Sequence, residues 1–285
     1  MSRPISHALF GGRRSWLRYV PRLQRWLRRL YLRQRSWAIP VGDDMILCRV
    51  LGAFKLFADP LDRSISPHLM MDGYWEPRTT ETMIDLMRYG MVAIDVGANL
   101  GYFTLLLSAL CGPQGRVLSF EPNPRTARRL QASIMLSPFR DRIDLYPDVL
   151  GETDGREVNL LLSHEHPGGT HVTALAPDGP DFIAARTRRL DGVPGALDAT
   201  LVKIDAEGME EAIWRGMTAM IAGDRLRYVI LEFSQNCYEN GPAMIDQAEA
   251  AGFTIAVIDD QRGVRPIDRK EIFDGTEQRM LLFRR

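Results

Sequence analysis

Four acidic residues of this 285-residue chain stand at the ends of short apolar runs. Asp95 ends MVAID, Glu121 ends VLSFE, Asp205 ends LVKID, and Glu232 follows VIL. Such runs are typical of buried strands, and ligands of open α/β sheets bind beyond the carboxyl ends of the strands. We therefore expect these four carboxylates to lie near a ligand.

A glycine-rich turn follows the first of these strands, in the segment Asp95–Val–Gly–Ala–Asn–Leu–Gly101. A G-x-N-x-G turn at a helix start carries little side-chain bulk, so its backbone N–H groups can approach a ligand closely. The spacing matches neither G-x-G-x-x-G nor G-x-x-x-x-G-K-[ST]. A carboxylate at Asp95 would repel a pyrophosphate and attract the ammonium and sulfonium groups of S-adenosylmethionine. The turn therefore favours this cofactor over a dinucleotide.

Glu121 ends the second strand, 26 residues after Asp95. A carboxylate at this strand tip can accept hydrogen bonds from both ribose hydroxyls of an adenosine ligand. Nicotinamide-dinucleotide sites share this feature, so it indicates an adenosine ligand without naming one. The alternative is that Glu121 only caps the following helix through Asn123–Pro124.

Four blocks of the sequence stand in a characteristic order: VAIDVGANLGYFTLLLS, GRVLSFEPNP, LVKIDAEGMEEAIWRGM and VILEFS. From about Gly73 to about Ser234 the chain resembles the FkbM family of S-adenosylmethionine-dependent methyltransferases. The resemblance implies a class I methyltransferase fold. This is a Rossmann-like α/β domain with a seven-stranded, mostly parallel sheet, an antiparallel last strand and helices on both faces. The implied cofactor is S-adenosylmethionine.

The resemblance also assigns individual residues by position. Glu121 would hold the ribose, Asp148 would lie on the adenine side, and Glu76 of the YWEP segment would face the site. The cofactor loop would comprise Asp95, Gly97, Asn99 and Gly101.

Methyl transfer to an alcohol requires removal of the hydroxyl proton, because a neutral oxygen is a poor nucleophile. A positioned carboxylate or histidine accelerates such a step by roughly 10²–10⁴-fold. The candidate general bases are Asp205, Glu232 and His171. Carboxylates at adjacent strand tips raise each other's pKa unless a cation lies between them, either Lys203 or a divalent metal. Oxygen ligands alone are a weak metal signal, so a magnesium ion bound by Asp205 with Glu232 or Glu207 is the less favoured alternative.

His171 shares the polar segment SHEHPGGTH with His164 and His166. This segment falls where the alternation of strands and helices breaks. We interpret residues 151–198 as an insertion that folds as a small antiparallel ribbon and could cover the acceptor. The histidine spacing is not a usual zinc pattern. An exposed loop histidine without a catalytic role is the alternative for His171.

Outside the insertion, residues 91–285 alternate apolar runs with helical patterns, as in a doubly wound sheet. We expect this Rossmann-like core to be preceded by a lead-in at 43–90, which contains two short strands. Together they form a methyltransferase domain over 43–285, and residues 1–42 form a basic N-terminal helical extension.

The extension contains ten arginines and no acidic residue, which leaves 26 basic against 36 acidic residues in the rest of the chain. Residues 15–34 place tryptophan, valine and leucine at three- and four-residue steps, with arginines over the remaining surface. Pro21 either kinks this helix or marks its start. Three interpretations stay open: a contact with an anionic membrane surface or membrane protein, docking on the acidic domain or a partner subunit, and an organelle presequence.

No run of about 18 apolar residues exists, and the three cysteines show no metal-ligand spacing. We expect reduced thiols and a cytoplasmic protein, with peripheral contact at the inner face of the membrane through residues 15–34. Because the catalytic part is net acidic, we expect no nucleic-acid partner. The oligomeric state stays open.

We therefore expect an S-adenosylmethionine-dependent methyltransferase that acts on a hydroxyl of a sugar, glycan or small secondary metabolite. One alternative is methylation of nitrogen or carbon in a small molecule. The other is a membrane-surface binding protein with a non-catalytic methyltransferase-like domain, against which the intact acidic residues argue.

Overall fold

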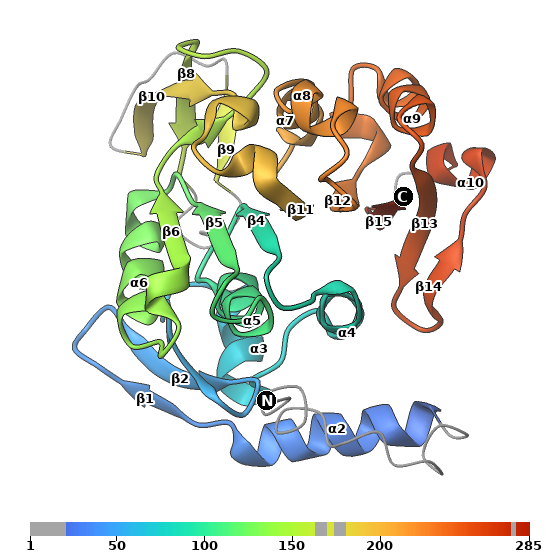
Figure 1. Cartoon of the computed structure of the whole chain (residues 1–285). Helices are drawn as coiled ribbons and strands as arrows, with labels where there is room; N and C mark the ends of the chain where they lie inside the picture. Colours follow the sequence, from blue (N-terminus) through green and yellow to red (C-terminus); the bar gives the residue numbers. More distant parts are fainter. Residues whose placement is uncertain (1–20, 163–169, 174–180, 275–277) are drawn as a thin grey trace.

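The computed structural model describes residues 21–162, 170–173, 181–274 and 278–285. Its centre is an eight-stranded sheet of order β14-β13-β15-β12-β11-β4-β5-β6 (Figure 1). The strands are β4 (Val92–Val96), β5 (Arg116–Phe120), β6 (Ile143–Tyr146), β11 (Ala199–Ile204), β12 (Tyr228–Phe233), β13 (Thr254–Asp259), β14 (Gly263–Pro266) and β15 (Arg279–Arg284).

The sheet is mostly parallel, as expected. β6, β5, β4, β11 and β12 pair in parallel, and β15 is antiparallel to both β12 and β13. The expected number of seven strands is wrong, because β14 pairs antiparallel with β13 as an eighth. The chain turns back there because Asp259 accepts the backbone N–H groups of Gln261 and Arg262, and Gly263 adopts a φ of 80°.

Helices cover both faces of the sheet because its strands alternate between two hydrophobic cores. On β11, Leu201 packs with α5 (Tyr102–Leu110) and α6 (Pro124–Met135), whereas Val202 packs into the opposite core. That core is built on α7 (Glu210–Arg215), α8 (Thr218–Ala222), α9 (Gly241–Ala250) and α10 (Arg269–Phe273). The chain enters at β4, moves outward to β6 and returns to β11, so β4 and β11 form the switch point where such sheets bind ligands.

The lead-in contains the two expected strands, β2 (Ile46–Val50) and β3 (Phe54–Ala58), followed by the helices α3 (Ser66–Met71) and α4 (Pro77–Leu86). β1 (Ala38–Pro40), which belongs to the N-terminal extension, pairs with β2 and completes a three-stranded antiparallel sheet. β3 packs on α6, where Arg129 and Asp59 form an ion pair at 3.1 Å with both side chains 2% exposed. Loss of either partner would leave a buried charge unpaired, so this contact joins the lead-in firmly to the core.

A second small sheet, of order β7-β10-β8-β9, lies between β6 and β11 in the chain. It consists of β7 (Val149–Leu150), β8 (Glu157–Leu161), β9 (His171–Thr173) and β10 (Phe182–Arg188). β8 pairs antiparallel with β9 and β10, so the segment interpreted as an insertion contains an antiparallel ribbon. His164 and His166 lie outside the described residues, and the division into domains stays a prediction.

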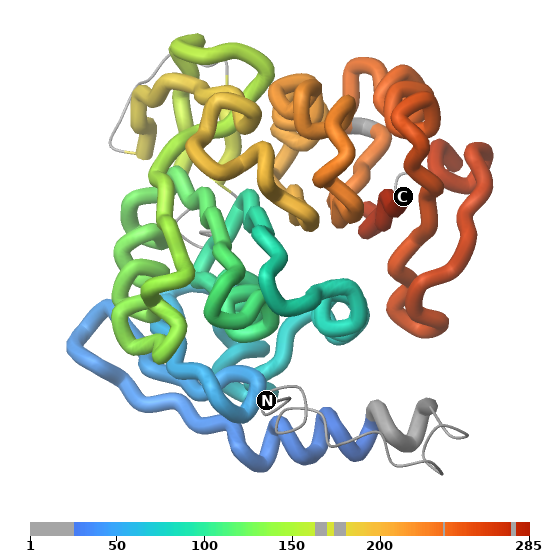
Figure 2. The backbone as a smooth tube through the Cα atoms, in the orientation of Figure 1, coloured from blue at the N-terminus to red at the C-terminus, as the bar shows by residue number. Residues whose placement is uncertain are grey.

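The N-terminal helix is described from Pro21, as α2 (Pro21–Arg35), and residues 15–20 lie outside the described range. One face of α2 docks on the lead-in, because Leu32 is 1% exposed and Arg28 forms an ion pair with Glu81 at 2.9 Å. In Figure 2, α2 lies along the lower edge of the molecule. No helix in the described part of the chain is long and apolar enough to cross a bilayer.

Candidate active site

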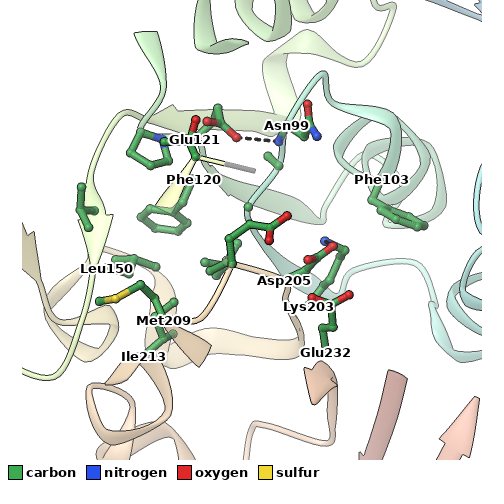
Figure 3. Close-up of a pocket in the computed structure, with 18 of the residues that line it drawn as sticks. Asn99, Phe103, Phe120, Glu121, Leu150, Lys203, Asp205, Met209, Ile213 and Glu232 are labelled. Atoms are coloured by element: carbon green, nitrogen blue, oxygen red, sulfur yellow. Dashed lines mark hydrogen bonds and ion pairs between the residues drawn. The ribbon is translucent and has the colours of Figure 1, made fainter. Parts of the chain in front are cut away.

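A pocket of about 300 Å³ opens at the carboxyl ends of the central strands. Its walls come from the 96–99 turn after β4, the tips of β5, β11 and β12, the start of α4 and the small sheet. Figure 3 shows that its two sides differ, since Phe120, Leu150, Met209 and Ile213 gather on one side and Lys203, Asp205 and Glu232 on the other.

The glycine-rich turn requires glycine at two positions, because a side chain at either would clash with a neighbouring element. Gly97 has a φ of 71°, and a Cβ at this position would lie 1.7 Å from the carbonyl oxygen of Asp205. Gly101 has a φ of 95°, and a Cβ there would lie 2.3 Å from Leu130. Gly97 therefore lets the turn approach the tip of β11, and Gly101 lets α5 pack against α6.

Glu121 organises this turn from the next strand. Its buried carboxylate accepts the backbone N–H of Asn99 at 2.8 Å and that of Asn123 at 2.9 Å. Burial raises the pKa of Glu121 to about 7, although these two hydrogen bonds oppose the shift. Asn123 caps α6 instead, because its side chain accepts the N–H groups of Arg125 and Thr126. Glu121 thus lines the pocket with lone pairs left for a ligand.

The apolar side of the pocket lies beside Asp148. Phe120 stacks on Tyr146 with ring centroids 5.0 Å apart, which presents a rigid hydrophobic surface. Asp148 lines the rim and forms an ion pair with Arg188 at 3.3 Å. An uncharged aromatic ring fits this side better than a charged group does.

Asp95 is fully buried and is not among the residues that line the pocket. Its carboxylate accepts the Thr104 hydroxyl at 2.6 Å and lies 3.9 Å from the Lys203 ammonium. The alternation of side chains along β4 turns it toward α5 instead of toward a ligand. The expectation that Asp95 itself discriminates among ligands is therefore corrected: it lies beneath the turn and pairs with Lys203.

Lys203 is the cation of the charged side. Its ammonium is 1% exposed, lies 3.0 Å from Asp205 Oδ2, and sits 5.2 Å from the centroid of the Phe103 ring. Burial alone would lower the pKa of Lys203, but the carboxylates of Asp205, Asp95 and Glu76 raise it above its ordinary value. Lys203 is therefore charged and compensates the acidic groups around it.

Glu76 and Glu232 complete the charged side from α4 and β12. Burial and the neighbouring Asp205 raise the pKa of both carboxyls, that of Glu232 to about 8. Oε2 of Glu76 and Oδ1 of Asn99 are buried without a hydrogen-bond partner among the described residues. Such atoms indicate a ligand that supplies hydrogen-bond donors.

The turn after β11 holds Asp205 in place. The buried carboxylate of Glu210 accepts the N–H groups of Ala206 at 2.8 Å and Gly208 at 3.0 Å. Glu207 of this turn also lines the pocket, and burial followed by the charge of Asp205 raises its pKa to about 7. Sequence reasoning gave Glu207 no role beyond a metal alternative, although its place directly after the strand was a usable signal.

His171 is not among the residues that line the pocket, but it lies near enough to lower the pKa of Glu207, which does line it, and its role as a base stays a prediction. Its neighbours Thr170 and Val172 line the pocket, but the side chain of His171 is exposed. Successive strand residues point to opposite faces, so β9 can present Val172 or His171 but not both. No cluster of three or more possible metal-binding side chains occurs in the described ranges.

The fold and the pocket together define a Rossmann-like methyltransferase of the S-adenosylmethionine-dependent class. The profile described as "Methyltransferase FkbM domain" matches residues 95–261, more than half of the chain. The chain therefore belongs to the FkbM methyltransferase family, as its sequence motifs indicate.

Solved methyltransferase structures show weaker similarity. An S-adenosylmethionine-dependent O-methyltransferase from Thermotoga maritima is 12% identical, with 84% of this chain and 77% of that one covered and a TM-score of 0.44. A TehB-like methyltransferase from Corynebacterium glutamicum is 13% identical, with coverages of 76% and 92% and a TM-score of 0.42. Precorrin-6y C5,15-methyltransferase from Geobacter metallireducens is 17% identical, with coverages of 73% and 87% and a TM-score of 0.39. Comparison with the curated proteins gives no match.

Proposed function

We propose that this chain transfers the methyl group of S-adenosylmethionine to a hydroxyl group of a sugar, a glycan or a small secondary metabolite. The observation that carries the proposal is the two-sided pocket (Figure 3), which joins an apolar side at Glu121 to a carboxylate-lined side at Asp205. The first suits adenosine, and the second suits a cationic sulfonium next to a group that loses a proton.

Different residues of the pocket bind different parts of the cofactor. Glu121 accepts hydrogen bonds from the ribose hydroxyls, and Phe120 packs against the adenine with Asp148 at its edge. The acidic side receives the ammonium and sulfonium groups, and the unpartnered oxygens of Glu76 and Asn99 fit a ligand that brings donors. When bound, the cofactor supplies an electrophilic methyl group at this acidic side.

Asp205 is the general base of the proposed reaction. It lies at the tip of β11, reaches the pocket, and is held by Lys203 at 3.0 Å. Its free oxygen takes the hydroxyl proton as the acceptor oxygen bonds to the methyl carbon, and the sulfur keeps the electrons of the broken bond. Glu232, with its raised pKa, keeps a proton at neutral pH and donates a hydrogen bond to orient the acceptor.

The experiment compares Asp205→Asn with Asp198→Asn, since exposed Asp198 lies at the opposite end of the same strand. Both proteins are incubated with radiolabelled S-adenosylmethionine and fractionated glycans and small metabolites. We expect Asp205→Asn to lower kcat by roughly 10²–10⁴-fold, with little change in S-adenosylhomocysteine affinity and none for Asp198→Asn. Cofactor binding without transfer would support the non-catalytic alternative, and label on nitrogen or carbon would contradict the hydroxyl acceptor.

A peripheral membrane contact through α2 is a second proposal, carried by its outward face. Trp26 is 60% exposed, Leu27 41%, Leu30 38% and Tyr31 44%, and Arg29 beside them is 64% exposed at its side chain. Aromatic and leucine side chains flanked by arginine are typical of helices that lie on anionic lipid surfaces. The opposite face already docks on the lead-in.

Co-sedimentation with phosphatidylserine-containing vesicles tests this contact. We expect the chain to bind them but not pure phosphatidylcholine vesicles, and Trp26→Ser combined with Leu30→Ser to abolish binding. Met135→Ser is the control, because Met135 is 55% exposed on α6, away from α2. Equal binding by the double variant, or no binding by the parent chain, would overturn the proposal.

A further inference from the structure

A second cavity, of about 670 Å³, begins where the charged side of the first pocket ends. The two cavities share the side chains of Glu76 and Glu232. The walls of the second cavity come from α4, the tip of β12, the β13–β14 hairpin, α10 and the start of β15. α4 contacts both strands of the β13–β14 hairpin, and Figure 1 shows these elements next to each other. An acceptor in this cavity would reach the methyl end of the cofactor site.

The charges of this cavity fall into three groups, apart from the exposed carboxylate of Asp260 at the hairpin turn. The first is the pair of shared carboxyls, Glu76 and Glu232, at the junction. The second is an internal ion-pair group in which Arg265 bonds Glu271 at 3.0 Å and Asp259 at 3.4 Å. These three side chains satisfy one another and hold the hairpin against α10, so they do not select a ligand.

Arg262 and Arg279 form the third group. Both line the cavity, and neither guanidinium forms a hydrogen bond or ion pair with any residue that the structure describes. Arg279 acts on Glu271 only at longer range and after Arg265, which dominates the lowered pKa of that carboxyl. A guanidinium has five N–H donors in a planar fork that matches phosphate and carboxylate groups.

We infer that the acceptor is an anionic alcohol, a hydroxyl compound that carries a phosphate or carboxylate group. Its hydroxyl lies at Glu232 and Asp205, and its anionic group is bound by Arg262 and Arg279 across the second cavity. Among the described residues, the junction offers two carboxyls and no cation to an anionic group, whereas the far part of the cavity offers Arg262 and Arg279, so the two ends of the acceptor enter in one orientation. This inference rests on the proposed function, and it narrows the acceptor class.

The test follows the arginine Nε–Hε signals by NMR in the full chain, first without and then with S-adenosylhomocysteine. Inorganic phosphate and acetate are titrated separately, and their arms distinguish a phosphate-binding from a carboxylate-binding site. We expect saturable shifts of the Arg262 and Arg279 signals with at least one anion. Arg262→Ala and Arg279→Ala should each raise the dissociation constant about fivefold or more, because a charge-assisted hydrogen bond is lost.

Arg225→Ala is the matched control, since Arg225 is an exposed arginine that precedes β12 at its amino end. Non-saturable shifts, equal shifts at Arg225, or unchanged affinity in Arg262→Ala and Arg279→Ala would overturn the anionic-acceptor site. Failure of the proposed function is read separately in the backbone amide signals of Gly97 and Asn99, as absence of any response to S-adenosylhomocysteine.

Discussion

The two sides of the cofactor pocket are built by the same device but present different chemistry. In each, a buried glutamate accepts two backbone N–H groups beyond strand ends. Glu121 accepts one from the turn after β4 and one from the segment after β5, and Glu210 accepts both from the turn after β11. The first turn offers small residues and an apolar floor, whereas the second offers Asp205 and Glu207. Similar backbone architecture therefore supports binding on one side and charge handling on the other.

The sides also differ in how far along the chain their parts come from. Phe120 and Glu121 are consecutive residues, and the turn they support begins at Gly97. The charged side combines Lys203 with Glu76, which lies at the start of α4 and more than a hundred residues earlier. The apolar side is built within the Rossmann-like core, where Leu150, Met209 and Ile213 join Phe120, whereas the charged side also depends on the packing of the lead-in against the sheet.

Gly97→Ala should break both sides together and give the largest effect. The added Cβ would meet the Asp205 carbonyl oxygen at 1.7 Å, so the turn and the tip of β11 must separate. We expect S-adenosylhomocysteine affinity, measured by isothermal titration calorimetry, to fall by about 100-fold or more. Gly192→Ala is the control because a Cβ at Gly192 meets no atom within 4 Å. Equal affinities of the two variants would contradict the close approach of these turns.

Glu121→Gln should distinguish the two sides of the pocket, because it weakens cofactor binding at the apolar side and leaves the charged side unchanged. The amide presents N–H donors where one carboxylate oxygen accepts a backbone N–H, so a buried donor loses its partner. The expected loss of S-adenosylhomocysteine affinity is about 10–100-fold, from a charged hydrogen bond worth about 1.5–3 kcal/mol. A matched Glu157→Gln on the exposed start of β8 should bind normally. Normal binding by Glu121→Gln would remove the ribose role from this residue.

The charged side should make the cofactor-free protein less stable as the pH rises. The pKa of Glu232 is raised from 4.5 to about 8, so between these values the folded state binds more protons than the unfolded state. The free energy of unfolding therefore falls as the pH increases through this window. Glu232→Gln should reduce this slope and raise Tm by roughly 2–4 °C at pH 8, measured by calorimetry. Unchanged pH dependence in that variant, with Asp198→Asn as the control, would refute the assignment.

Asp148→Asn should give the smallest effect. Asp148 lies on the pocket rim and is already paired with Arg188, with side chains 31% and 32% exposed, so solvent screens its charge. We expect S-adenosylhomocysteine affinity to fall less than about fivefold. A loss of affinity as large as that of Glu121→Gln would indicate that Asp148 on the rim, and not Glu121, makes the main contact with adenosine.

The sequence predicted the parts of this site that local patterns determine. Strand tips, the glycine-rich turn and Glu121 follow from periodicity and spacing, and the structure places them together. Asp95 was misjudged because the direction of a side chain at a strand end depends on which face α5 covers. The sequence could not show whether Val172 or His171 lines the pocket, because a one-residue change of register on β9 exchanges them. β14 escaped detection because a four-residue edge strand gives too short a pattern, although Asp259 and Gly263 are turn residues.

The second cavity is likewise a feature that the sequence could not predict. Arg262 and Arg279 are separated in the sequence by α10, and both line the second cavity because β13 pairs with β14 and with β15 in the sheet. Their lack of ion-pair partners in the described ranges is a property of the folded chain, and no spacing rule in the sequence expresses it.

The central claim is that one pocket holds S-adenosylmethionine with its adenosine at Glu121 and its reacting end at Asp205. A crystal structure of the chain with S-adenosylhomocysteine tests it most directly. We expect both ribose hydroxyls on the Glu121 carboxylate, the adenine against Phe120, and the sulfur on the side of Asp205 and Glu232. A ligand bound in the reverse direction, or outside this pocket, would contradict it.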